Sequence, residues 1–123
     1  MPWSYLSDGT KRLFYIITEC VSVKNGIVLM EEPKLRVHPH QLFSLMNFIK
    51  EQAREKQIIV TTHSPIVLDI LSPDELNKIT IVSLAGNKSV FNKLSSEQMD
   101  TAKQYMEEKA DLSYYWLHSD LEK

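Results

Sequence analysis

Two short, continuous apolar runs stand out in the pattern of hydrophobic and polar positions along this chain. Ile27–Met30 follows an Asn25-Gly26 turn, and Ile58–Val60 begins a second run that we extend to Thr62. Neither run alternates between apolar and polar residues, and strands of a parallel sheet lack that alternation because both of their faces are covered. The pattern therefore predicts two buried, parallel strands, over 27–30 and 58–62.

Helical spacing marks the segments next to these strands. Residues 11–23 carry apolar side chains at helical intervals after the capping sequence Ser7-Asp8-Gly9, although their β-branched content leaves a strand open as the alternative. Pro39 suits the first turn of a helix, and an apolar face with a polar opposite face then continues to about Ala53. A helix between two strands predicts a parallel pair joined by a right-handed crossover.

Strand patterning returns in the second half of the chain as a hairpin. Segments 79–84 and 89–94 are rich in apolar residues and flank a turn around Gly86, which indicates two antiparallel strands. Ahead of them, Ser64-Pro65 is expected to begin a short helix that ends at Leu71.

Two further helices are predicted after the hairpin. Ser95, with Gln98 three residues later, forms a capping box for a helix to about Lys109, and an amphipathic segment follows over 112–121. Because no repeat or Pro/Gly-rich linker divides the chain, we expect one domain over 1–123. The predicted fold class is α/β: a largely parallel sheet with covering helices and a C-terminal β-hairpin.

Composition and charge describe an ordinary soluble domain. Hydrophobic residues make up 43% of the chain and charged residues 24%, and the net charge of −2 gives no global attraction to nucleic acid. The single Cys20, expected in the core, cannot form an internal disulfide and fits a reducing cytoplasm, where we place the protein. No apolar stretch reaches the roughly 18 residues of a membrane span, and we expect neither secretion nor a membrane partner.

Acids and a histidine lie just after the two predicted strands. Glu31 and Glu32 follow the first strand, and Thr62-His63 ends the second. Ligands of open α/β sheets bind beyond the carboxyl ends of the strands, where paired acids can hold Mg²⁺ and polarise a water, and a histidine can contact a terminal phosphate. A phosphate-cradling G-x-x-x-x-G-K-[S/T] loop is missing, because none of the three glycines begins one. The sequence thus indicates half of a nucleotide-hydrolysing site.

Three segments around these residues occur in a characteristic order: Leu6–Arg12, Met30–Pro39 and Thr61–Pro65. They resemble the signature, Walker B and switch-histidine motifs of the C-terminal half of an ABC-class ATPase head, in the SMC, RecF and OLD-like branch of AAA-family ATPases. The resemblance covers residues 6–71 and implies a partial P-loop NTPase fold that lacks the Walker A lobe. Asp8 and Thr10 depart from the L-S-G-G-Q signature.

Two departures concern the Walker B segment. Glu31 replaces the more widespread aspartate, and Lys34 stands where the branch usually has another acid.

The resemblance also implies a role for each candidate residue. Ser7 and Gly9 would donate hydrogen bonds to the terminal phosphate of a nucleotide held by the Walker A loop of another subunit. Glu31 would position Mg²⁺, mostly through water, and Glu32 would orient and deprotonate the attacking water. His63 would contact the γ-phosphate.

The implied cofactors are ATP and Mg²⁺, bound only together with the complementary lobe. The expected partner is that Walker A-bearing lobe, or a second copy through the exposed sheet, with a nuclease or DNA possible at the level of a larger complex. DNA repair, chromosome maintenance and phage defence are the processes that the resemblance suggests.

Other interpretations of the same residues stay open. Ser7 can simply cap a helix, and the two glutamates can form a solvated acidic loop. The chain can be a non-catalytic interaction module that keeps the half-fold, or a metal-dependent nuclease built on Glu31 and Glu32, for which further clustered acids are missing. A zinc site at His38 and His40 needs additional ligands.

Overall fold

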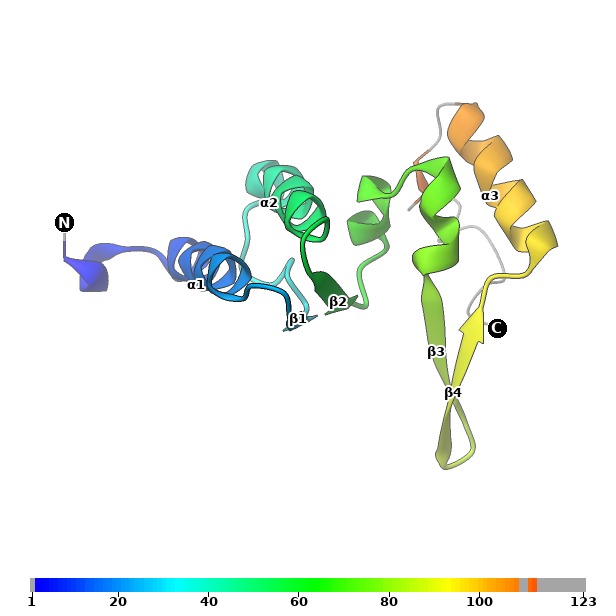
Figure 1. Ribbon diagram of the computed structural model, residues 1–123, viewed down its shortest axis with the longest axis horizontal. Coiled ribbons are helices and arrows are strands. Elements are labelled where there is room, and N and C mark those ends of the chain that lie inside the picture. Colours follow the sequence, from blue (N-terminus) through cyan, green and yellow to red (C-terminus); the bar gives the residue numbers. More distant parts are fainter. Residues whose placement is uncertain (1, 109–110, 113–123) are drawn as a thin grey trace. The chain divides into compact units, whose positions relative to one another are not determined.

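The computed structural model describes residues 2–108 and 111–112, and the chain divides into two compact units, 1–70 and 71–123. The single domain expected over 1–123 stays a prediction. Each unit is described below by itself (Figure 1). Every helix among the described residues is too short or too polar to span a bilayer.

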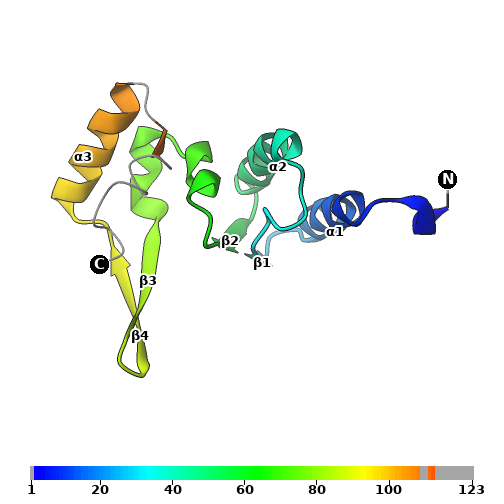
Figure 2. The ribbon, with the colours of Figure 1, turned by 180° about the vertical axis from the view of Figure 1, so that it is seen from behind.

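The first unit places two helices against a pair of parallel strands. Strands β1 (Ile27–Glu31) and β2 (Gln57–Thr61) pair in parallel, with Val28 opposite Ile58. Helices α1 (Asp8–Ser22) and α2 (Pro39–Gln52) lie on the same side of that pair (Figures 1 and 2). The 3₁₀ helices η1 (Trp3–Tyr5) and η2 (Pro65–Ile70) begin and end the unit. The predicted parallel pair and its crossover helix are confirmed.

Residues 11–22, for which the sequence left helix or strand open, lie within helix α1. The Ser7 hydroxyl accepts a hydrogen bond from the Thr10 amide and caps the first turn. The inward face contributes Ile16 and Cys20 to the core, which confirms the predicted burial of Cys20. Burial raises the pKa of the Cys20 thiol. The rest of this core comes mainly from α2 and consists of Val28, Val37, Leu42, Leu45, Met46, Ile49 and Val67.

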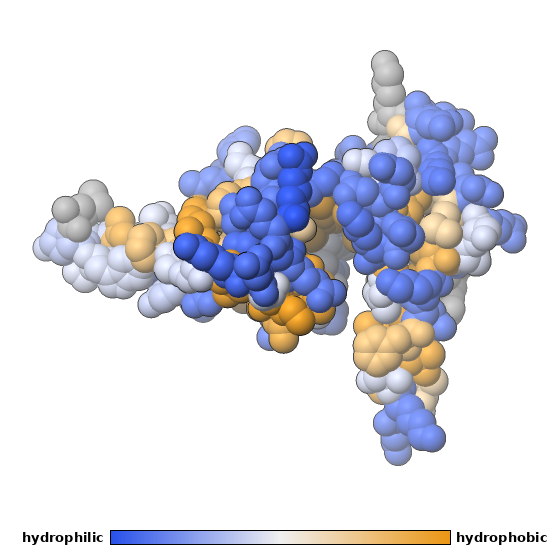
Figure 3. All heavy atoms as spheres, viewed as in Figure 1, coloured by the Kyte–Doolittle hydropathy of each residue, from blue (hydrophilic) through white to orange (hydrophobic). Residues whose placement is uncertain are grey.

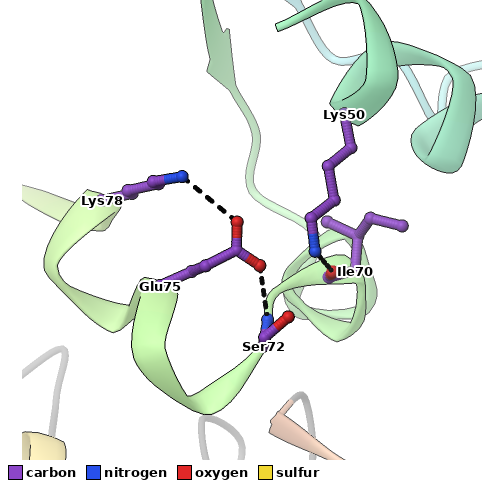
Figure 4. Close-up of polar contacts among 5 residues, drawn as sticks. All are labelled: Lys50, Ile70, Ser72, Glu75 and Lys78. Atoms are coloured by element: carbon purple, nitrogen blue, oxygen red, sulfur yellow. Dashed lines mark hydrogen bonds and ion pairs between the residues drawn. The ribbon is translucent and has the colours of Figure 1, made fainter. Parts of the chain in front are cut away.

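Two lysines tie the elements of this unit together through backbone carbonyls. The buried Lys56 donates to the carbonyl of Cys20, at the end of α1, and to the Gln52 side chain. On α2, the Lys50 ammonium donates to the Ile70 carbonyl at 3.1 Å, which fixes η2 against that helix (Figure 4). Long aliphatic stems let both lysines bridge elements while their charge stays hydrogen-bonded.

The opposite face of the β1–β2 pair is open. Ile27, Leu29 and Ile59 are exposed to 58%, 75% and 44%, and hydrophobic residues gather on the lower side of this unit in Figure 3. The uninterrupted apolar runs predicted strands covered on both faces, but in the described residues only one face is covered. The unpaired side of β1 lines a groove of about 340 Å³ beside α1.

The second unit is a hairpin with helices of its own. Strands β3 (Thr80–Ala85) and β4 (Lys88–Lys93) are antiparallel around a turn in which Gly86 adopts a φ of +63°, a conformation that favours glycine. Helix α3 (Ser96–Glu107) begins with the predicted capping box of Ser95 and Gln98. Among the described residues of this unit, the buried ones are Leu76, Ile79, Leu94, Ala102 and Leu112.

A 3₁₀ helix that sequence patterning missed, η3 (Pro73–Lys78), precedes the hairpin. Glu75 accepts a hydrogen bond from the Ser72 amide at 2.9 Å and pairs with Lys78, as Figure 4 shows. Its capping signature, Ser-Pro-x-Glu, is readable in the sequence, but the segment is too short to show helical periodicity.

The expectation of one largely parallel sheet is only partly met. The described strands form two separate two-stranded sheets, β1–β2 and β3–β4, of which the second is antiparallel. A hairpin satisfies its inner backbone groups locally, so its strands need no partner from the parallel pair. Apart from Leu112, the amphipathic segment predicted over 112–121 lies outside the described residues.

We predict that the open face drives self-association of the isolated chain, because large apolar patches are rarely left in water. The double substitution Leu29→Ser and Ile59→Ser should reduce both association, measured by light scattering across a concentration series, and the fluorescence of an apolar-surface dye. The free energy of unfolding should change by less than about 0.5 kcal/mol for each exposed site. As the matched control, Val28→Ala on the covered face should destabilise the chain by about 2 kcal/mol. A monomeric, dye-silent unmodified chain would contradict this prediction.

Candidate functional site

The C-terminal tips of β1 and β2 meet at the acids that the sequence singled out. Strand β1 ends at Glu31, opposite Thr61, and the Glu32 amide donates to the Thr61 carbonyl at 2.8 Å, one residue beyond the strand. Glu32 has a φ of +44°, in the left-handed region that few non-glycine residues adopt. The chain therefore turns sharply at Glu32, directly where the parallel ladder stops.

The carboxylate of Glu32 joins the two strand tips. One oxygen accepts a hydrogen bond from the Thr62 hydroxyl at 2.9 Å, and the other accepts one from the His63 amide at 2.5 Å. The hydrogen bond from the His63 amide is the main cause that holds the pKa of Glu32 below its usual value; partial burial opposes the shift, and the Thr62 hydroxyl supports it. Glu32 is therefore ionised at neutral pH, and its carboxylate is held by the residues that follow β2.

Thr62 is a site residue that sequence reasoning missed. Its hydroxyl donates to Glu32 and accepts a hydrogen bond from the Ser64 amide at 2.9 Å. The hydroxyl thus orders the segment after β2 and the acid after β1 together. A threonine one position before the candidate histidine was visible in the sequence, but its partner is 30 residues away along the chain.

Glu31 and His63 present side chains to solvent at the same strand tips. Both residues are exposed, and the Glu31 carboxylate makes no hydrogen bond within the described residues. Magnesium binds hard oxygen ligands and often takes only one or two carboxylates, completing its shell with phosphate oxygens and waters. Among the described residues no group of three His, Cys, Asp or Glu side chains converges, so a Mg²⁺ ion at Glu31 would need such outside ligands. The exposed carboxylate fits that mode of binding.

Arg12 is a second residue that sequence reasoning left without a role. From α1, its Nη2 donates to the carbonyls of Glu31, at 2.9 Å, and Glu32, at 2.8 Å. Its Nε is buried and has no hydrogen-bond partner within the described residues. The arginine was part of the signature-like segment, but that resemblance directs attention to Ser7 and Gly9 and not to the helix that follows.

Ser7 and Gly9 lie at the N-terminus of α1. The Ser7 hydroxyl caps the helix through the Thr10 amide, at 3.1 Å, and bonds the Thr10 hydroxyl at 2.9 Å. The capping interpretation of Ser7 is therefore realised, and a role toward phosphate stays a prediction. As the first helical residues, Asp8 and Gly9 have amides without an intrahelical acceptor, a feature of helix N-termini that suits anions.

Gly9 has a packing reason to be glycine. A Cβ at this position would lie 2.4 Å from the backbone carbonyl oxygen of Arg36. Arg36 itself has a φ of +63°, and its guanidinium lies 3.7 Å from the Asp8 carboxylate, with both side chains largely exposed. The loop after the acids thus rests on the first turn of α1. Neither Ser7 nor Gly9 contacts Glu32 or His63 directly; Arg12 and the Arg36 loop connect the two places.

The His38-Pro39-His40 sequence serves helix α2. Nδ1 of His38 accepts a hydrogen bond from the His40 amide at 3.3 Å, and the two rings stack with centroids 5.0 Å apart. Pro39 is the first helical residue, as its fixed φ favours. This pair therefore has a capping role, and no third described ligand joins it.

We predict that Gly9→Ala destabilises the chain in the absence of any nucleotide. The new methyl group would collide with a backbone atom, so α1 or the Arg36 loop must shift, and overpacking of this kind costs about 1–3 kcal/mol. Urea denaturation followed by circular dichroism measures the change. Asp8→Ala is the matched control, because an exposed ion pair contributes less than about 1 kcal/mol. Equal stability of Gly9→Ala and the unmodified chain would show that the contact is not tight in solution.

A second prediction concerns acid. Because the folded pKa of Glu32 lies below the unfolded value, its carboxylate stabilises the fold above the unfolded pKa, and this contribution disappears as pH falls through the folded pKa. Glu32→Gln should therefore lower the free energy of unfolding at pH 7, and its difference from the unmodified chain should shrink at roughly pH 3. Denaturant titrations at both pH values test this.

The control for that experiment is Glu31→Gln. Its exposed carboxylate has no hydrogen bond in the described residues, so the substitution should change the free energy of unfolding at pH 7 by less than about 0.5 kcal/mol. A Glu32→Gln effect of the same size at both pH values would contradict the hydrogen-bonded, ionised carboxylate.

This chain is similar in sequence to part of two longer curated proteins. The chain is 32% identical to Septu protein PtuA of Bacillus thuringiensis, over 60% of this chain and 22% of that protein. It is 29% identical to the uncharacterized protein MJECL43 of Methanocaldococcus jannaschii, over 78% of this chain and 27% of that protein. The chain therefore spans about a quarter of the length of these curated relatives.

Fold and family are consistent with each other. A solved structure from work on the ATP-driven dimerization and DNA-stimulated activation of SMC ATPases superposes with a TM-score of 0.58 at 20% identity, covering 85% of this chain and 63% of that one. The likeness shows the SMC ATPase-like fold. The sequence model of the family described as "AAA domain, putative AbiEii toxin, Type IV TA system" matches residues 1–69, and the chain belongs to this AAA domain family.

Proposed function

We propose that this chain is the signature, Walker B and switch half of an ABC-class ATPase, which binds and hydrolyses ATP·Mg²⁺ together with a Walker A-bearing lobe. The observation that carries the proposal is the clasp at the strand tips, where Glu32 takes hydrogen bonds from Thr62 and His63. Membership of an AAA domain family and the fold likeness to an SMC ATPase support it.

Glu32 is the acid that handles the attacking water. Each of its carboxylate oxygens already accepts one hydrogen bond, and each keeps a further lone pair for a water. Its lowered pKa makes it a weak base, so it acts chiefly by holding the water in line, and it takes a proton only as the new bond to phosphorus forms.

Glu31 and His63 serve the phosphates. Glu31 would hold Mg²⁺, largely through water, because its carboxylate is exposed and unpaired within the described residues. An ion held there would supply positive charge to offset that of the phosphate oxygens. His63 contacts the γ-phosphate from the tip of β2. The hydrogen bond that its backbone amide donates to the Glu32 carboxylate links loss of that phosphate to the acid.

Ser7 and Gly9 act on a different nucleotide. The N-terminus of α1 carries free amides and the positive end of the helix dipole, which together favour an anion. In a closed complex this end would cap the terminal phosphate that a second subunit holds. Asp8 adds a negative charge there, which Arg36 partly offsets.

The remainder of the site comes from a complementary lobe. The chain has no Walker A loop, and the open face of β1 and β2 is the surface on which further sheet and helix would pack. A homo-oligomer through the same surface is the alternative assembly. A nuclease or DNA partner, a cytoplasmic location and, from the relative named Septu protein PtuA, phage defence complete the proposal.

A non-catalytic interaction module is the second candidate. Two observations favour it: Ser7 is occupied as a helix cap, and the apolar face is well suited to binding another protein. This candidate predicts no turnover in any assembly.

We expect the isolated chain not to bind ATP·Mg²⁺ in calorimetric titration, because the phosphate loop supplies most triphosphate contacts. With a Walker A-bearing lobe added, turnover should appear. In that complex, Glu32→Gln should lower kcat by about 100-fold or more and leave ATP binding intact, since the amide keeps the shape and loses the base. His63→Ala should also lower kcat, and Glu31→Gln should raise the Mg²⁺ concentration needed.

Glu55→Gln is the matched control, because Glu55 is an exposed glutamate in the turn after α2 and should leave turnover unchanged. Micromolar ATP affinity of the chain alone would overturn the half-site proposal. Turnover by Glu32→Gln at the unmodified rate would overturn the assignment of Glu32.

A further inference from the structure

Arg12 holds the backbone of both acids from a neighbouring helix. Its single Nη2 nitrogen donates to the carbonyls of Glu31 and Glu32 at 2.9 and 2.8 Å, so one group spans two successive peptide units. Both carbonyls lie at the point where the parallel ladder of β1 and β2 ends. Arg12 therefore replaces, from the side of α1, the donors that a continuing strand would supply.

The turn at Glu32 needs such support. A non-glycine residue with φ of +44° is strained and persists only when its surroundings over-determine it. On one side of this turn Thr62 and His63 hold the carboxylate; on the other side Arg12 holds the carbonyls. The direction of the Glu32 side chain thus depends on both sets of contacts.

Arg12 and the anion-suited helix end belong to the same rigid segment. Gly9, against the Arg36 carbonyl, is one helical turn before Arg12, and Ser7 caps that turn. Rigid secondary-structure elements are among the features that carry coupling between sites, and α1 joins its N-terminus to Arg12 within about one turn. A shift of α1 would stretch the two hydrogen bonds to the acids.

We propose that Arg12 is a positioning residue that couples the N-terminus of α1 to the carboxylate of Glu32. This coupling rests on the proposed function. A phosphate that binds at Ser7 and Gly9 would then set the position of the hydrolytic acid, Glu32. Each nucleotide of a closed complex would then influence the acid used on the other.

The unpaired Nε of Arg12 agrees with this role. Burying an N–H without a partner costs about 1–3 kcal/mol. The guanidinium leaves its Nε unpaired in this position, where its Nη2 donates to both carbonyls. Lysine would supply a charge without the planar fork that fixes the direction of the donors, so it can replace only part of the arrangement.

The first test uses the full chain without nucleotide. Hydrogen exchange of the His63 amide, which donates to the Glu32 carboxylate, is followed by NMR at one neutral pH in the unmodified chain, Arg12→Ala, Arg12→Lys and the control Arg54→Ala. Arg54 pairs with Glu51 on the exposed side of α2 at 3.4 Å, far along the chain from the acids. We expect the His63 amide to exchange faster in Arg12→Ala, to a smaller degree in Arg12→Lys, and at the unmodified rate in Arg54→Ala, because a displaced Glu32 carboxylate no longer accepts its hydrogen bond.

An unchanged exchange rate of the His63 amide in folded Arg12→Ala would overturn the proposal, even if that variant is less stable. If Arg12→Ala does not fold, Arg12→Lys decides by the same criterion. Thermal unfolding of each variant separates lost stability from lost positioning.

The second test uses the complex with a Walker A-bearing lobe. Arg12→Ala should lower kcat by about 100-fold with the KM for ATP unchanged, because a misplaced acid slows chemistry without weakening nucleotide binding. An effect on KM alone would overturn the coupling. If the unmodified complex hydrolyses no ATP, the proposed function is wrong, and the hydrogen exchange of the His63 amide still decides whether Arg12 positions Glu32.

Discussion

Glu32 joins the ends of two strands that the chain reaches 30 residues apart. Its amide extends the ladder to Thr61, and its carboxylate receives the Thr62 hydroxyl and the His63 amide. The left-handed backbone at Glu32 turns the chain away from the sheet at this point. A single residue thus ends the strand, holds the segment after β2 and keeps a charge at the strand tips. These hydrogen bonds also bring Glu31 and His63 to the same strand tips.

Helix α1 approaches the same acids through backbone atoms and not through their side chains. Arg12 binds two carbonyls, and Gly9 lets the Arg36 carbonyl come close to the first turn. Side-chain oxygens of the acids are thereby left for the β2 tip and for solvent. Helix α1 and the acid segment are therefore joined through backbone atoms, and the carboxylates take no part in that contact.

In the first unit, helices cover one face of the two-stranded sheet, and the other face is apolar and exposed. Both helices cover the side that carries Val28, whereas Leu29 and Ile59 on the opposite side are exposed. Exposed apolar surface of this kind lowers the stability of an isolated chain and favours association. The apolar face therefore favours a further body packed against it, and the proposed half-site would require the same.

Much of this protein could be predicted from the sequence, because local rules govern it. Apolar runs located β1 and β2, helical spacing with Pro39 located α2, and the Ser95–Gln98 box located the start of α3. The sequence also determined that Glu32 and His63 would meet, since the carboxyl ends of parallel strands share one edge of a sheet. Only the tertiary structure decided the rest: that the hairpin forms its own sheet, that Thr62 and Arg12 hold the acid segment, and that Gly9 faces the Arg36 carbonyl. Those contacts join residues far apart in the chain, and their partners are often backbone atoms that leave no trace in residue type.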